Sequence, residues 1–101
     1  MHSKILWPNN KKFAFTIFDD TDRANLKNNK LVYQYLDTLG FKTTKSVWIF
    51  QGNNFHEDGG VTCEDQEYLK WLLELKNKGF EIGYHNTTYQ SSNRDKIEKG
   101  L

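Results

Sequence analysis

Two apolar segments of this 101-residue chain end in side chains that could bind a metal ion. Asp19 and Asp20 follow the apolar run 13–18, and His85 follows the run 80–84. Carboxylates are costly at the buried end of a strand unless a cation lies near them, because burial disfavours their charge. If both runs are parallel strands of one sheet, their carboxyl ends open on the same edge. Two carboxylates and an imidazole would then meet there, and such a set suits metal-assisted hydrolysis.

The segments that must position these side chains alternate between strand and helix patterns. We predict strands over 12–18, 46–50 and from Phe80 to His85, and helices over 25–39, between Thr62 and Gly79, and from Ser92 onward. The first strand is a nearly continuous apolar run, as expected where both faces of a sheet are covered. The alternation implies the α/β class, a parallel βαβαβ(α) unit with right-handed helical crossovers.

Helix boundaries and buried faces follow from local patterns. Gly40 and Gly79 are expected to stop the first two helices. Thr62 with Asp65, and Ser92 with Asp95, have the spacing of capping boxes that begin the second and third helices. Apolar residues at helical spacing predict the buried stripes. These are Leu31, Val32, Tyr35, Leu36 and Leu39 in the first helix, and Tyr68, Leu69, Leu72, Leu73 and Leu75 in the second. Trp48 and Trp71 are expected to pack in the core.

The expected sheet is small for an independent unit. Three parallel strands expose two long edges, and the third helix has barely two turns. We therefore expect residues 1–101 to form a single domain that is the N-terminal part of a larger α/β barrel or sheet. A self-contained minidomain is the alternative.

Composition excludes several classes of protein. A net charge of +1 with scattered lysines argues against a general nucleic-acid binder. No apolar run approaches the roughly 20 residues that span a bilayer, and no secretory signal is seen, which favours the cytoplasm. The single cysteine, Cys63, excludes an intrachain disulfide and cannot alone build a zinc finger.

The residues of the two strand ends also resemble a known family. The run 15–20, Phe-Thr-Ile-Phe-Asp-Asp, is similar to the first signature of the polysaccharide deacetylase family, commonly Thr-Phe-Asp-Asp-Gly. The run 80–85, Phe-Glu-Ile-Gly-Tyr-His, is similar to the approach to its second signature, usually Glu-Ile-Gly-Asn-His followed by a second histidine. The resemblance covers essentially the whole chain and reaches only the first half of a family domain.

This resemblance implies a distorted (β/α) barrel and a hydrolase that removes N- or O-acetyl groups from carbohydrates with a divalent metal, most often zinc. Asp19 would be the general base, and Asp20 and His85 would be metal ligands. Metal-bound water would attack the acetyl carbonyl, and the metal would stabilise the oxyanion. The partner implied is an acetylated carbohydrate.

The chain departs from the family pattern at two positions. Thr21 stands where the family has glycine, and Tyr89 stands where it has the second histidine. A phenol is an uncommon zinc ligand, so the third ligand would come from elsewhere. Gln90 and His56 are weak candidates for it.

A shifted pattern of some divergent relatives suggests Asn86, directly after His85, and Arg94, just inside the third helix, as weak candidates for substrate binding. His56, in the long loop 51–61, is a third weak candidate that does not belong to this pattern. For the cluster His56-Glu57-Asp58 we prefer a solvated turn between glycines over a lid that holds metal or sugar.

Two other functions compete with a deacetylase. One is an inactive deacetylase-like domain that binds sugar or a partner. The other is a phosphotransferase of the haloacid dehalogenase type, whose Asp-x-Asp spacing is met by Asp20 and Asp22. That motif normally continues with Gly-Thr, whereas Arg23 and Ala24 follow here, so this reading ranks low.

Overall fold

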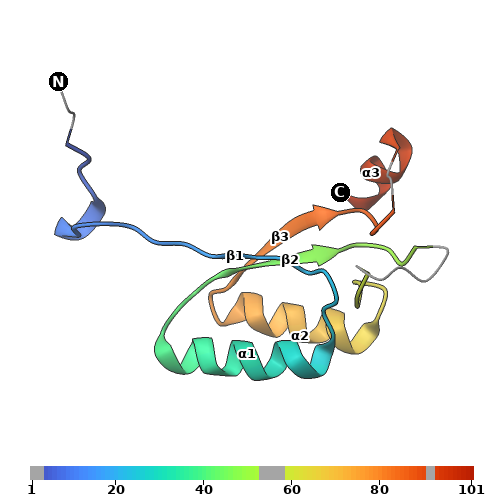
Figure 1. Cartoon of the computed structure of the whole chain (residues 1–101), viewed down its shortest axis with the longest axis horizontal. Coiled ribbons are helices and arrows are strands. Elements are labelled where there is room, and N and C mark those ends of the chain that lie inside the picture. Colours follow the sequence, from blue (N-terminus) through green and yellow to red (C-terminus); the bar gives the residue numbers. More distant parts are fainter. Residues whose placement is uncertain (1–3, 53–58, 91–92) are drawn as a thin grey trace.

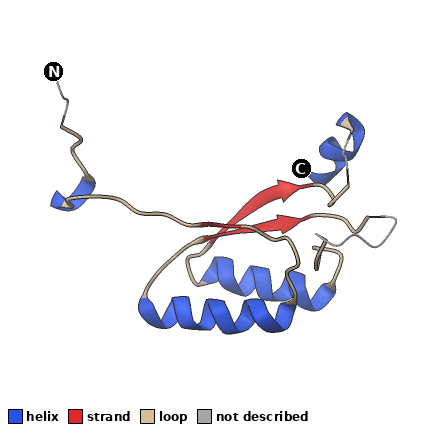
Figure 2. Cartoon of the chain, viewed as in Figure 1, coloured by secondary structure: helices blue, strands red, loops and turns tan. Residues whose placement is uncertain are grey.

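The computed structural model describes residues 4–52, 59–90 and 93–101, which form a parallel three-stranded sheet with strand order β1-β2-β3 (Figures 1 and 2). The strands are β1 (Phe18–Asp19), β2 (Thr44–Trp48) and β3 (Glu81–Asn86), and the helices are η1 (Pro8–Asn10), α1 (Leu26–Leu39), α2 (Gln66–Asn77) and α3 (Arg94–Gly100). Both strand pairings are parallel, so the predicted α/β class is confirmed. Within the described ranges, no helix is long and apolar enough to cross a membrane.

Helices α1 and α2 lie side by side against one face of the sheet, and α3 lies beyond the carboxyl ends of β2 and β3 (Figure 1). The core fills the layer between helices and sheet. The Tyr33 ring meets Trp71 and Phe80 edge-on, with centroids 5.5 and 5.2 Å apart. Trp48 and Trp71 are buried, as expected. The core cluster consists of Tyr33, Val47, Tyr68, Trp71, Leu72, Leu75 and Phe80.

Local chemistry sets the end of α1 as predicted and the start of α2 at a different residue from the one predicted. Gly40 closes α1 in the left-handed conformation, with φ 78°. Helix α2 is capped by Asp65, whose side chain accepts from the Tyr68 N–H, and not by Thr62. The reason is that Thr62 forms an extended bridge with Trp48, which commits its backbone to the sheet edge.

The third helix is capped by Asn93, whose side chain accepts from the Lys96 N–H. The predicted cap, Ser92, lies outside the described residues.

The predicted stripe of α1 is wrong for four of its five residues. Leu31, Val32, Tyr35 and Leu39 are exposed, and the side of the helix that faces the core carries Leu26, Tyr33 and Leu36. Tyr33 decides this orientation, because its ring packs in the core while its hydroxyl donates to Asp19 on β1. The stripe of α2 is largely confirmed, although Leu73 is exposed.

The first strand is also shorter than predicted. Only Phe18 and Asp19 pair with β2, and the preceding Phe13 and Phe15 are 75% and 71% exposed. The register explains the difference, since Phe18 lies opposite Thr44, the first residue of β2. Ile17 O still accepts from the Thr44 N–H at 2.9 Å, and residues 12–16 precede the part of the chain that lies beside β2. The second strand begins at Thr44, two residues earlier than predicted, and ends at Trp48.

Candidate metal centre

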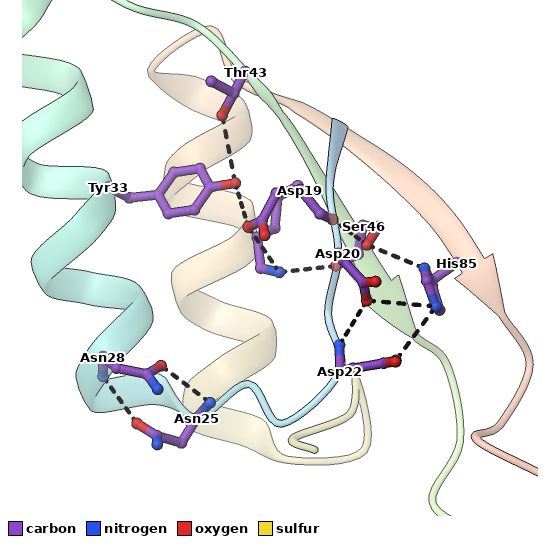
Figure 3. A network of polar contacts seen from close by, with 10 residues as sticks. Asp19, Asp20, Asp22, Asn25, Asn28, Tyr33, Thr43, Ser46 and His85 are labelled. Carbon is purple, nitrogen blue, oxygen red and sulfur yellow. Dashed lines mark hydrogen bonds and ion pairs between the residues drawn. The ribbon is translucent and has the colours of Figure 1, made fainter. Parts of the chain in front are cut away.

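Three side chains with metal-binding atoms converge at the carboxyl edge of the sheet (Figure 3). The His85 Nε2 atom lies 3.8 Å from Asp20 Oδ1 and 3.5 Å from Asp22 Oδ1. One ligand atom from each of the three residues lies within 4.8 Å of the others. The structure thus brings together Asp20 and His85, the two expected ligands, and adds Asp22.

A tight turn after β1 brings Asp22 back toward Asp20. The Asp20 carboxylate accepts from the Asp22 N–H at 2.9 Å, and Ala24 N–H donates to Thr21 O at 3.1 Å. Asp and Asn stabilise turns in this way, because a short side chain can bond to the backbone two residues further on. The turn itself aims both carboxylates at the same region.

The backbone of segment 59–61 forms hydrogen bonds with this turn. Arg23 N–H donates to Gly59 O at 2.8 Å, and Val61 N–H donates to Ala24 O at 2.9 Å. A Cβ atom at Gly60 would lie 2.8 Å from Ala24 N and 2.9 Å from Ala24 O. Only glycine permits such a close approach of two backbones.

His85 reaches the site through an irregularity in β3. Tyr84 pairs with Val47 and Asn86 with Trp48, so His85 is the extra residue of a β-bulge. Bulges re-aim a side chain at a strand end. The imidazole packs edge-on against Trp48, with ring centroids 4.6 Å apart, and its Nδ1 atom lies 3.5 Å from Ser46 Oγ.

Asp19, the expected general base, points away from this cluster (Figure 3). Its Oδ2 atom accepts from the Tyr33 hydroxyl at 2.8 Å and lies 3.2 Å from Lys45 Nζ. Successive side chains of a strand point to opposite sides, so Asp19 and Asp20 diverge. Burial lowers the pKa of Lys45, against the attraction of Asp19, and raises the pKa of Tyr33.

The weaker candidates lie outside the three-residue cluster. Asn86 Oδ1 accepts from the Thr87 N–H, and Arg94 pairs with Glu98 on the exposed surface of α3. Gln90 lies against Gly52, since a Cβ atom at that glycine would be 2.8 Å from Gln90 Oε1. His56 lies outside the described residues.

Asp22 is the ligand candidate that sequence reasoning missed. The signal for it is the Asp-x-Asp spacing with Asp20, a spacing that is typical of phosphotransferases. The sequence did not identify Lys45 and Ser46 as neighbours of the site. Both belong to a strand whose residues are all buried.

The cluster has the composition and openness of a cation site. Asp20 is 67% exposed, Asp22 41% and His85 27%. Two carboxylates and one imidazole suit zinc and other first-row divalent ions, and three protein ligands leave a coordination position for water or substrate. These three residues could therefore hold a metal ion.

Comparisons of the chain with protein-family models, with curated proteins and with solved structures found no match. The functional argument therefore depends on the geometry described above and on the sequence motifs.

Proposed function

We propose that this protein is a metal-dependent hydrolase of the polysaccharide deacetylase type, which removes acetyl groups from a carbohydrate. Asp20, Asp22 and His85 would hold a divalent cation, with zinc as the first candidate. The observation that carries the proposal is the convergence of these three side chains at the carboxyl edge of a parallel sheet. Active sites of α/β folds are built at that edge.

Asp22 would be the third metal ligand, which the family resemblance did not identify. The chain has Tyr89 at the position of the family's second histidine, which left Asp20 and His85 without a third ligand. The Asp22 carboxylate lies 3.5 Å from His85 Nε2 and completes a set of three. The parallel order β1-β2-β3, with helices between the strands, is compatible with the opening segment of a distorted (β/α) barrel, which we propose as the wider fold.

A divalent cation at this position would supply Lewis acidity, which activates water and polarises the acetyl carbonyl. Asp19, the general base implied by the resemblance, faces the other side of β1 and contacts Tyr33 and Lys45, so we do not assign it the proton of the attacking water. That proton would leave to solvent, to which the Asp20 and Asp22 side chains are open.

The metal site is tested by calorimetric titration of the chain with zinc. We expect one zinc ion per chain at micromolar affinity or better, and a loss of about 100-fold or more in Asp20→Asn, Asp22→Asn and His85→Ala. The matched control is Asp95→Asn, which removes an exposed carboxylate from α3 and should leave the affinity unchanged. A folded wild-type chain that does not bind zinc, or binds it equally well in all three variants, would refute the site.

The reaction is tested by acetate release from an N-acetylglucosamine oligomer and from an O-acetylated xylan oligomer. The zinc-loaded chain should release acetate from one of them. The three ligand variants should not, while Asp95→Asn should retain the activity. Zinc binding without acetate release from either oligomer would contradict the hydrolase and favour the second candidate.

That second candidate is an inactive deacetylase-like domain that binds sugar or a partner. It is favoured by Tyr89, whose ring packs edge-on against Trp48 with centroids 6.3 Å apart and would contact any side chain at Gly52. Tyr89 thus packs against Trp48 at the position where the family has a metal-binding histidine. Binding of the intact oligomers with no acetate release would identify this function.

A further inference from the structure

Ser46 on β2 lies between the two strands that supply the metal ligands, and its side chain contacts both. Its Oγ atom donates a short hydrogen bond to the backbone oxygen of Asp19 on β1. The same Oγ atom lies 3.5 Å from Nδ1 of His85 on β3, the outer limit of a hydrogen bond. The whole residue is buried, with 0% exposure, so water does not compete for the hydroxyl.

The proton count at Ser46 determines the direction of the second contact. A serine hydroxyl has one proton and two lone pairs, and a backbone carbonyl oxygen can only accept. The Ser46 proton is therefore used by Asp19 O, and Ser46 Oγ can only accept from His85. This contact requires a proton on His85 Nδ1.

A neutral imidazole with its proton on Nδ1 has its lone pair on Nε2. Nε2 is the atom that faces the Asp20 and Asp22 carboxylates, at 3.8 and 3.5 Å. A ring nitrogen can bind a metal only through a lone pair, and the hydrogen bond of the other nitrogen sets which one is available.

We propose that Ser46 is a positioning residue that selects the Nδ1–H tautomer of His85 and so presents the Nε2 lone pair to the cation. The inference rests on the proposed metal site, and it adds to that site a residue from the middle strand. The Trp48 ring packs edge-on against the imidazole, with ring centroids 4.6 Å apart, and fixes the orientation of the His85 ring, while Ser46 selects its tautomer.

The tautomer is measured directly by ¹⁵N NMR of the metal-free chain at a pH of about 9, where an ordinary imidazole is neutral. His85→Gln identifies the His85 signals. The Asp22 carboxylate, 3.5 Å from Nε2, competes for the same proton, so we expect a measurable Nδ1–H population in the wild-type ring and a shift toward Nε2–H in Ser46→Ala. A wild-type ring with no Nδ1–H population, or an unchanged population in Ser46→Ala, would overturn the inference.

Thr44 offers a matched control. Its hydroxyl also bridges β2 and β3, donating to Glu81 Oε2 at 2.8 Å, but at the far end of the strand pair. Thr44→Val removes that hydroxyl while keeping the shape of the side chain. It should leave the tautomer of His85 unchanged. An equal shift in Thr44→Val and Ser46→Ala would mean that general loosening of the sheet, and not Ser46, changes the ring.

Zinc calorimetry gives a second readout. Ser46→Ala should weaken zinc binding by about 10- to 100-fold, as removal of a partner of a ligating histidine does. Ser46→Thr, which keeps the hydroxyl, should bind within a few fold of the wild type. Unchanged affinity in Ser46→Ala would refute the positioning role. If the wild type binds no zinc, the proposed function fails, while the NMR measurement still decides the tautomer separately.

Discussion

The two aspartates that end β1 belong to polar clusters with opposite surroundings. Asp19 faces the helices and forms a closed cluster with Tyr33 and Lys45, both of which contact its Oδ2 atom. Lys45 Nζ also donates to Ser46 O at 3.0 Å, and its side chain is 0% exposed. The charges of this cluster neutralise one another inside the protein.

Asp20 faces the opposite direction and forms an open cluster with Asp22 and His85. Two carboxylates point at one imidazole, and all three side chains are in contact with solvent. Like charges at this distance repel each other unless a cation lies between them. The comparison therefore separates a structural ion pair from a group that could hold a metal ion, although the two carboxylates are neighbours in the chain.

The largest effect is expected from Asp19→Asn, which leaves the buried Lys45 without its carboxylate. Removing one partner of a buried ion pair is strongly destabilising, and we expect the free energy of unfolding to fall by about 3 kcal/mol. Urea denaturation measures it, with the exposed Asp95→Asn as the control. A loss equal to that of the control would show that the closed cluster does not stabilise the fold.

A smaller effect is expected at the turn that carries Asp22. Gly60→Ala forces a Cβ atom to 2.8 Å from the backbone of Ala24, so one of the two segments must move. We expect about 2 kcal/mol of destabilisation and weaker zinc binding. Gly100→Ala is the control, since its Cβ would lie 3.3 Å from the Thr87 side chain, a tight contact that needs a shift of only a few tenths of an ångström and involves no backbone atom. A destabilised variant with wild-type zinc affinity would show that the open cluster does not need this support.

The closed cluster should also be sensitive to alkaline pH. Burial raises the pKa of Tyr33, so above pH ~10 the unfolded chain releases a phenol proton that the folded chain retains. Stability then falls with pH by about 1.4 kcal/mol per unit for this group. The lowered pKa of Lys45 acts in the opposite direction, but its contribution is complete above the ordinary lysine value of about 10.4.

Burial also raises the pKa of Tyr68, so urea melts between about pH 10.5 and 11.5 report the two buried tyrosines together. Tyr33→Phe should reduce the slope, and Tyr35→Phe, which changes an exposed ring on the same helix, should not. Equal slopes in the wild type and Tyr33→Phe would place Tyr33 outside the closed cluster.

The smallest effect on stability is expected from Asp20→Asn. Without metal, this exposed side chain should change the free energy of unfolding by less than about 0.5 kcal/mol, and relief of repulsion from Asp22 favours an increase. With zinc at 100 times its dissociation constant, the wild type should gain about 2.7 kcal/mol and the variant no more than about 0.4 kcal/mol. Thermal melts with and without zinc compare the two. Equal stabilisation of both by zinc would refute the open cluster as the binding site.

Much of the fold could be predicted because its signals are local. The alternation of apolar runs with helical stripes, and Gly40 after α1, depend on residues close together in the chain. The orientation of α1 could not be predicted, because it depends on the hydrogen bond from Tyr33 to a strand residue 14 positions away. The length of β1 depended in the same way on where its partner begins, at Thr44.

The candidate site likewise has a part that could be predicted from the sequence and a part that could not. The meeting of Asp20 and His85 followed from the rule that parallel strands end at one edge. The inclusion of Asp22 required the turn held by the segment 59–61, and the inward direction of Asp19 required Lys45 across the sheet. Neither contact has a pattern in the sequence around the aspartates.

Strand and helix periodicity, which acts within a few residues, was enough to predict the class of fold and the edge of the sheet where polar side chains gather. Which aspartate joins the imidazole, and which pairs with a buried lysine, depends on the direction of each side chain relative to the packed layers. Contacts such as those of Ser46 with Asp19 and His85 exist only once three separate strands lie side by side.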